Sequence, residues 1–130
     1  MVQTQILNKI DDPRLTLHVV WTPVLQDDNY DAAVESQSLI TDPRVTHYWD
    51  GEMALGTVYG ENVKLPNGRD FAWDIYFAFG DGVVWRDNVP QPADFAHQLG
   101  MDERHLRNGA GLRKIVEKLL AELNSPSSRQ

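Results

Sequence analysis

The sequence predicts a single α/β domain whose elements follow the order β-α-β-α-β-β-α. Three observations support this prediction. Two short apolar runs, each introduced by an Asp-Pro-Arg phrase, lie about 30 residues apart, which is the length of a β-α-β unit. The phrase Gly80-Asp81-Gly82 separates two further apolar runs, as in a hairpin. Near its end the chain carries an apolar stripe with helical spacing.

Length and composition exclude several classes of protein. A chain of 130 residues can bury a core as one domain. The absence of cysteine excludes disulfides, thiolate catalysis and zinc–thiolate sites. No apolar stretch approaches the roughly 20 residues that cross a bilayer, and the start MVQTQILNKIDD lacks the pattern of a secretory signal. We therefore expect a soluble, cytoplasmic protein with no membrane partner.

The net charge of −7 is unevenly distributed. Residues 1–102 hold 16 acids and 6 bases, whereas residues 103–130 hold 3 acids and 6 bases. Because an acidic body repels phosphate backbones, we expect no nucleic acid partner. The basic residues near the end suit the solvated face of a last helix, since cations are favourable in its C-terminal half.

The first half of the chain reads as two strands, each followed by a helix. Residues 15–21 are rich in β-branched and apolar side chains and barely alternate, which is typical of a strand covered on both faces. A helix is predicted over 29–40, with Asp28 placed as its N-cap. Residues 45–49 form the second predicted strand. A helix over 52–62 follows, although two glycines within it lower its helical propensity.

The second half predicts a hairpin and a closing helix. Strands are predicted over 74–79 and 83–85, joined by the Gly-Asp-Gly turn. A Pro-rich link then leads to a short helical piece over 93–99. The final helix, 111–123, is indicated by one continuous apolar stripe, made by Leu112, Ile115, Val116, Leu119, Leu120 and Leu123. Residues 124–130 are polar and Ser-rich, so we expect a disordered tail.

This layout resembles the thioredoxin-like superfamily over residues 14–123, with a mixed four-stranded sheet flanked by helices. The paired cysteines of that family would fall just after Trp21, where this chain has Thr22-Pro23-Val24-Leu25. The family's loop proline would fall near Ala72-Trp73, where there is no proline. The resemblance therefore implies the scaffold and its working edge without redox chemistry. The alternative fold is an α+β cone similar to the nuclear-transport-factor family, which usually opens with helices, whereas this chain is expected to open with a strand.

Three tryptophans are expected to share one rim of the sheet. Trp21 and Trp49 close the first two strands, and Trp73 begins the third, which runs the opposite way. In open α/β sheets, ligands bind beyond the carboxyl ends of the parallel strands. Four acids accompany the tryptophans: Asp27, Asp28, Asp50 and Asp74. An aromatic and acidic rim suits a flat or cationic ligand, or an Arg-bearing peptide. A structural reading stays open, with the tryptophans as core and Asp28 and Asp50 as helix caps.

Acid/base chemistry is the only catalysis that the residues favour. There is no Gly-x-Ser-x-Gly elbow and no Gly-x-Gly-x-x-Gly loop. The candidates are Asp74, assisted by Asp50, with His47 or with His97, which is expected on a surface loop after the Pro-rich link. His18 and His47 lie in neighbouring predicted strands, but a metal needs three or more ligands on one side. We therefore expect no metal and no cofactor.

Three readings of function follow. The leading one is a binding or interaction module that holds a peptide, a protein or a small molecule at the Trp/Asp-lined edge, through Trp21, Trp49, Asp50 and Trp73. The alternative is a small cofactor-free acid/base enzyme, a hydrolase, lyase or isomerase, that uses Asp74 with His47 or His97. The third is homo-oligomerisation, for example as a homodimer, through an edge strand, with the rim serving as an interface.

Overall fold

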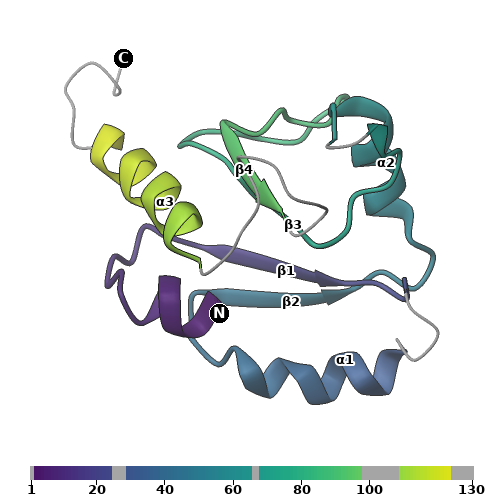
Figure 1. The fold of residues 1–130 in the computed structure, drawn as a ribbon, viewed down its shortest axis with the longest axis horizontal. Coiled ribbons are helices and arrows are strands. Elements are labelled where there is room, and N and C mark those ends of the chain that lie inside the picture. The colour runs from purple at the N-terminus through teal and green to yellow at the C-terminus, as the bar shows by residue number, and fades with distance from the viewer. Residues whose placement is uncertain (1, 25–28, 66–67, 98–108, 124–130) are drawn as a thin grey trace.

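The computed structural model describes residues 2–24, 29–65, 68–97 and 109–123. This part of the chain is a mixed α/β structure whose four strands form two separate two-stranded sheets (Figure 1). The elements are a π-helix η1 (Val2–Leu7), β1 (Leu17–Trp21), α1 (Tyr30–Ser36), a 3₁₀ helix η2 (Gln37–Leu39), β2 (Val45–Trp49), α2 (Ala54–Asn62), β3 (Ile75–Ala78), β4 (Asp94–His97) and α3 (Ala110–Leu123). The predicted single four-stranded sheet is not formed within the described residues, because no ladder of hydrogen bonds joins the two pairs of strands.

The first sheet pairs β1 and β2 in parallel, as the sequence predicts. Its register runs from Leu17 opposite Val45 to Trp21 opposite Trp49. The two Asp-Pro-Arg phrases form matching turns just before the two strands, in which each aspartate accepts the backbone N–H of the arginine two residues later, at 2.9 Å in both turns. The amide of Leu17 also donates to the carbonyl of Arg44 at 3.1 Å, which fixes the start of the register.

Arg44 ties the start of β2 to the N-terminal segment. Its guanidinium donates to the carboxylate of Asp42 at 2.8 Å, to the carbonyl of Leu7 at 2.8 Å, and to the carbonyls of Ile10 and Asp12. The side chains of Arg44 and Asp42 are only 14% and 16% exposed. Hydrogen bonds from the arginine lower the pKa of the Asp42 carboxyl to about 2. Hydrogen bonds from Arg14 likewise lower the pKa of the Asp12 carboxyl to about 2, although the Arg14–Asp12 pair is more exposed.

The second sheet pairs β3 with β4 in antiparallel fashion, from Ile75 opposite His97 to Ala78 opposite Asp94. Two predictions are wrong here. Residues 83–85 form no strand, and residues 94–97 form a strand where a short helix over 93–99 was predicted. The Gly-Asp-Gly phrase does make a turn, but the chain runs on before it pairs with β3. Residues 94–97 form a strand and not a helix because pairing with β3 buries Ala96 and His97. This burial is a tertiary contribution that local propensity does not include.

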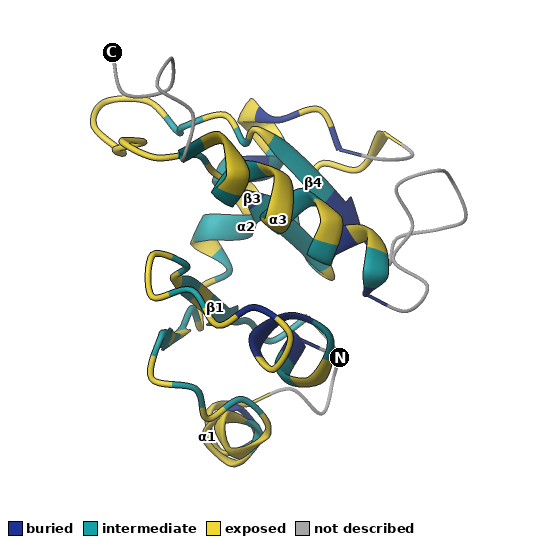
Figure 2. Ribbon diagram, turned by 90° about the vertical axis from the view of Figure 1, so that its left-hand side faces the viewer, coloured by how far each residue is buried: buried dark blue, intermediate teal, exposed yellow. Residues whose placement is uncertain are grey.

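The two sheets lie in different layers of the molecule. In Figure 1 β1, β2 and α1 lie on one side, and β3, β4 and α3 lie on the other. Figure 2 shows the same separation of β1 and α1 from β3, β4 and α3. Four residues of the predicted apolar stripe of α3 are confirmed as part of the core. Leu112, Ile115, Val116 and Leu120 belong to one cluster with Ile6 of η1, with Ile10 after it, and with Ala96 of β4. The expectation that the chain opens with a strand is wrong, because it opens with η1, whose residues Val2, Ile6 and Leu7 are buried. The parallel β1–β2 pair differs from the curved antiparallel sheet of the alternative fold.

A second core cluster lies around α2. Tyr59, Val63 and Leu65 are buried there beside partly buried residues of β3 and its flanks, including Phe77. The glycines that weaken the helix in sequence terms are required by packing. A Cβ at Gly56 would lie 2.6 Å from the ring of Phe71, and one at Gly60 would overlap the backbone of Asp70. The amide of Ala72 also donates to the carbonyl of Gly56 at 3.0 Å, so segment 70–72 crosses the helix in direct contact.

The helix α1 is mostly exposed, and Ala33 is its buried residue (Figure 2). Asn29 caps it by accepting the amide N–H of Ala32 at 2.8 Å. The predicted cap, Asp28, lies outside the described residues, as does the predicted tail 124–130. The predicted helix 29–40 is confirmed in place, with its last turn in 3₁₀ form. In the described part of the chain, no helix combines the length and the apolar character that crossing a membrane requires.

Candidate functional site

The predicted meeting of Trp21 and Trp49 occurs at the carboxyl ends of the parallel strands. The two residues are direct register partners and each is the last residue of its strand. Both side chains are partly exposed. The parallel sheet therefore places two indoles side by side where open α/β sheets hold their ligands.

Trp21 is oriented by a chain of hydrogen bonds through His47. Its indole Nε1 donates to Nδ1 of His47 at 3.1 Å, and the two rings stack with centroids 6.1 Å apart and 14° between their planes. The other ring nitrogen of His47, Nε2, lies 3.0 Å from the carbonyl oxygen of Ile40. A neutral imidazole that accepts at Nδ1 and donates from Nε2 satisfies both contacts. Both nitrogens of His47 are thereby occupied, which counts against its use with Asp74 in an acid/base step.

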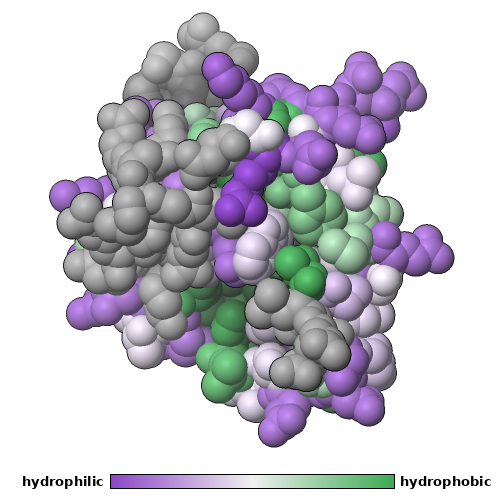
Figure 3. Space-filling view, turned by 45° about the vertical axis from the view of Figure 1, so that its right-hand side comes forward, coloured by the Kyte–Doolittle hydropathy of each residue, from purple (hydrophilic) through white to green (hydrophobic). Residues whose placement is uncertain are grey.

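Trp49 is held on its own side by an aromatic and a glycine contact. The ring of Tyr30 meets it edge to face, with centroids 6.1 Å apart and 78° between the planes. The position of a Cβ on Gly51 would lie 2.9 Å from Nε1 of Trp49, so the indole lies close against that glycine. Tyr30 itself is 59% exposed. We call Trp21, Tyr30 and Trp49 the aromatic edge. Figure 3 shows the side of the molecule toward which β1 and β2 run, where apolar and near-neutral residues lie among hydrophilic ones.

Asp50 organises the turn behind the aromatic edge. Its carboxylate accepts the amides of Ala54 and Leu55 at 3.1 and 2.8 Å, as the helix-cap reading predicts. The left-handed backbone of Met53, with φ of 59°, lets the chain turn tightly enough for these contacts. The amide of Asp50 also donates to the carbonyl of Trp21 at 2.8 Å. Asp50 thus fixes the end of β1, the end of β2 and the start of α2 together.

Trp73 and Asp74 lie just before β3, in the other sheet. Trp73 is partly buried, and within the described residues no ring contact joins it to Trp21 or Trp49. Asp74 is exposed and adopts a positive φ of 49°. Burial, and to a smaller extent the charge of Asp74, raises the pKa of Tyr76. The remaining predicted rim acids, Asp27 and Asp28, lie outside the described residues.

Of the other two described histidines, His18 lies in β1 as predicted, whereas His97 is not placed as predicted. His97 is fully buried in β4 beside Phe95, so the expectation of a surface loop is wrong; the strand carries it beneath α3. His18 and His47 do not meet, because adjacent register positions point to opposite faces of a sheet. His18 instead stacks on Tyr48, with its Nδ1 3.2 Å from the phenol oxygen. Across the described ranges no three histidine, aspartate or glutamate side chains gather in a way that could hold a metal.

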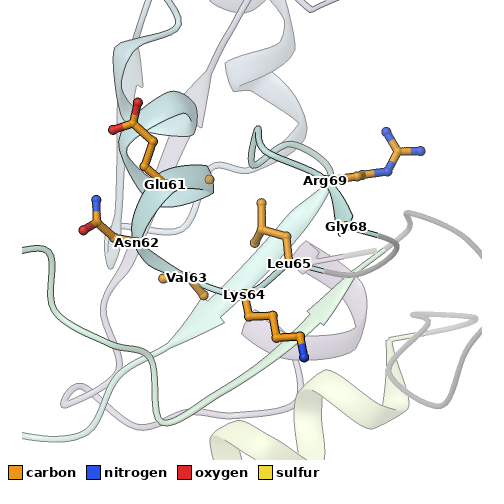
Figure 4. A pocket seen from close by; sticks show the side chains of 8 residues that line it. Glu61, Asn62, Val63, Lys64, Leu65, Gly68 and Arg69 are labelled. Atoms are coloured by element: carbon orange, nitrogen blue, oxygen red, sulfur yellow. The ribbon is translucent and has the colours of Figure 1, made fainter.

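A hollow of about 380 Å³, which no sequence pattern predicts, lies beyond the end of α2. Leu65 points into it, whereas the charged ends of Glu61, Lys64 and Arg69 point away from one another (Figure 4). A ligand site needs polar groups that converge. This hollow lacks that convergence.

Comparison of the chain with protein-family models, with curated proteins and with solved structures gives no match. A function for this chain is therefore inferred from the geometry of the aromatic edge and from its charge.

Proposed function

We propose that this protein is a binding module without redox chemistry, and that its aromatic edge holds a peptide or a small molecule with a cationic group. The observation that carries the proposal is the register pairing of Trp21 with Trp49 at the strand ends, where both indoles stay partly exposed. The polar groups nearby are used internally: the N–H of Trp21 binds His47, and the carboxylate of Asp50 caps α2. One face of the Trp21 ring stacks on His47 and Tyr30 contacts Trp49, so a ligand would bind the parts of the two indoles that stay exposed.

The charge around the aromatic edge supports a cation. Residues 15–63, which form β1, α1, β2 and α2, contain eight acids and a single base, Arg44. That one base is engaged by Asp42 and by three backbone carbonyls. An aromatic ring attracts a guanidinium or ammonium by about 0.5–2 kcal/mol, and surrounding negative charge attracts it further. An arginine side chain of a partner peptide fits both conditions.

As part of the same proposal, the chain is a cysteine-free relative of the thioredoxin-like superfamily. Its element order from β1 to α3, with a parallel first pair and an antiparallel second pair, supports this relationship. A mixed four-stranded sheet would further require β3 to lie against the free edge of β1. Cross-strand nuclear Overhauser effects between residues 17–21 and 75–78 would establish that adjacency, and their absence would remove the relationship.

Titration with a short arginine-bearing peptide tests the binding proposal. Tryptophan fluorescence and calorimetry would follow binding, and the same peptide with citrulline in place of arginine isolates the contribution of charge. We expect Trp49→Phe to weaken binding by a few-fold to about tenfold, since phenylalanine is a poorer partner for a cation. Trp85→Phe is the control, because Trp85 is more exposed than Trp49 and packs on Tyr59 in the other core cluster.

Two further results decide the site. A Trp73→Phe variant that binds normally would leave Trp73 outside the site, whereas weaker binding would place it there as the sequence predicts. If neither peptide perturbs the fluorescence, and Trp49→Phe alters only the free energy of unfolding, the tryptophans are core residues and the binding proposal fails.

A further inference from the structure

The sequence contains two Asp-Gly pairs, Asp50-Gly51 and Asp81-Gly82. An aspartate side chain closes onto the backbone most readily when glycine follows it, because glycine has no Cβ to shield its amide nitrogen. This closure is the first step of a chemical modification of aspartate. The folded structure holds the two pairs in very different ways, so it decides which of them can react.

Asp81 lies in an open turn after β3. Both it and Gly82 are exposed, and a Cβ added at Gly80 or at Gly82 would meet nothing within 4 Å. Among the described residues, no hydrogen bond or ion pair engages the carboxylate of Asp81. The positive φ of Gly82, 77°, favours glycine at that position of the turn. The side chain of Asp81 can therefore swing toward the amide nitrogen of Gly82 without breaking a contact.

Asp50, in contrast, is held by its neighbours. Its carboxylate accepts the amides of Ala54 and Leu55 at 3.1 and 2.8 Å. Its backbone amide donates to the carbonyl of Trp21 at 2.8 Å, and its backbone carbonyl accepts the hydroxyl of Thr22 at 3.3 Å. Closure of the Asp50 side chain onto the next amide would break both hydrogen bonds to the carboxylate, which are of the stronger, charge-assisted kind.

We propose that Asp81 is a site of spontaneous isomerisation to isoaspartate in the folded protein, and that Asp50 is protected from it. The amide nitrogen of Gly82 attacks Cγ of the protonated Asp81 carboxyl group. The N–Cγ bond forms, the Cγ–OH bond breaks, and the hydroxyl leaves with the amide proton as water. Water then opens the cyclic imide. Cleavage between the nitrogen and Cγ restores aspartate, whereas cleavage between the nitrogen and the main-chain carbonyl carbon gives isoaspartate.

Isomerisation changes the turn without changing the mass of the chain. The backbone then runs through Cγ, which lengthens it by a methylene group, and the former main-chain carbonyl becomes the free carboxylate. Because the turn follows β3 directly, the modification alters the path by which the chain leaves that strand. This inference does not depend on the proposed function, since Asp81 does not belong to the aromatic edge.

Incubation of the whole protein in a mildly acidic buffer, followed by tryptic digestion, tests the proposal. Trypsin places Asp50 in peptide 45–64 and Asp81 in peptide 70–86, so mass spectrometry with electron-transfer fragmentation assigns isoaspartate to each site separately. We expect isoaspartate to accumulate several-fold faster at Asp81 than at Asp50. Isoaspartate from the Asn-Gly pairs of the chain falls in other peptides and follows the loss of ammonia, which changes their mass.

The chain unfolded in guanidinium chloride is the reference for protection. There both Asp-Gly pairs lose their folded surroundings, so Asp50 and Asp81 should react at similar rates. A preference for Asp81 that persists in the unfolded chain would show that the flanking sequence sets it, and the protection of Asp50 by its hydrogen bonds would be wrong.

Two variants at position 81 serve as controls. Asp81→Asn replaces the carboxylate, a poor electrophile at neutral pH, by an amide, so isoaspartate at this position should form faster at neutral pH. Asp81→Glu keeps the charge but would require a less favourable six-membered ring, so isoaspartate in peptide 70–86 should fall to background. Because the position is exposed, the far-UV circular dichroism of both variants should match the original. The proposal is overturned if Asp50 and Asp81 react alike in the folded protein, or if Asp81→Glu leaves the isoaspartate content of peptide 70–86 unchanged.

Discussion

At the scale of single residues, the two Asp-Pro-Arg phrases form the same local turn, but their arginine side chains are buried to different extents. In each, an aspartate accepts both the backbone N–H and the guanidinium of the arginine two positions later. The side chain of Arg14 is 42% exposed and pairs with Asp12. The side chain of Arg44 is 14% exposed, and it pairs with Asp42 while it also donates to three backbone carbonyls. The sequence shows the shared turn, but only the packing distinguishes the two arginines.

The lowered pKa values of Asp12 and Asp42 predict a loss of stability in acid. Each is about 2 in the folded protein, below the ordinary value of 3.8. Because the folded state binds these protons less tightly than the unfolded state, their contribution is present above about pH 4 and is lost as the pH falls through about 2. Urea unfolding at pH 6, 4, 3 and 2 should show a falling midpoint. Since the two shifts are alike, Asp42→Asn should remove about half of the loss that the pair causes. A pH profile unchanged in that variant would contradict the assignment.

At the scale of elements, α2 illustrates a case in which propensity and packing disagree. Gly56 and Gly60 lower the intrinsic tendency to form a helix, yet segment 70–72 can cross the helix only because both side chains are absent. Their spacing of four residues places both glycines on one face. The contact between α2 and segment 70–72 therefore depends on the helix face that carries the two glycines, which are the residues with the lowest helical propensity in α2.

Replacement of Gly60 by alanine should be strongly destabilising. The new methyl group would overlap the backbone of Asp70, which cannot move aside as a flexible side chain would. We expect the free energy of unfolding to fall by about 3 kcal/mol or more. Gly111→Ala is the matched control, because Gly111 lies in α3 with open space around it, and there the change should stabilise by up to about 1 kcal/mol. Urea unfolding measures both, and similar effects at the two sites would show that packing on α2 is not the cause.

Prediction from the sequence succeeded where the signal was local and failed where it was not. The parallel pair 17–21 and 45–49, and with it the meeting of Trp21 and Trp49, follows from two turns and two apolar runs. The α3 stripe follows from helical spacing. Residues 83–85 were assigned to a hairpin because Val-Val-Trp follows a glycine turn, but β3 pairs with residues 94–97 instead. The burial of His97 could not be foreseen, since it depends on that distant pairing and on the cover that α3 provides.

At the scale of the whole molecule, the N-terminal segment connects the two layers. Ile6 of η1 lies in one cluster with Ala96 of β4 and Leu112 of α3, which belong to the second layer. The carbonyls of Leu7 and Ile10 accept hydrogen bonds from Arg44, which directly precedes β2 of the first layer. No element is predicted for residues 2–7 from the sequence, because the burial of Val2, Ile6 and Leu7 depends on contacts with distant segments of the chain.

Removing the side chain of Ile6 should therefore destabilise both layers together. Ile6 is only 3% exposed, so Ile6→Ala leaves a cavity at the junction and should lower the free energy of unfolding by about 3 kcal/mol. Leu39→Ala, at a residue that is 70% exposed, should change it by less than about 0.5 kcal/mol. Urea unfolding followed by tryptophan fluorescence and by far-UV circular dichroism should give coincident midpoints, both lowered by Ile6→Ala. Separate midpoints would mean that the layers unfold independently and that η1 does not join them.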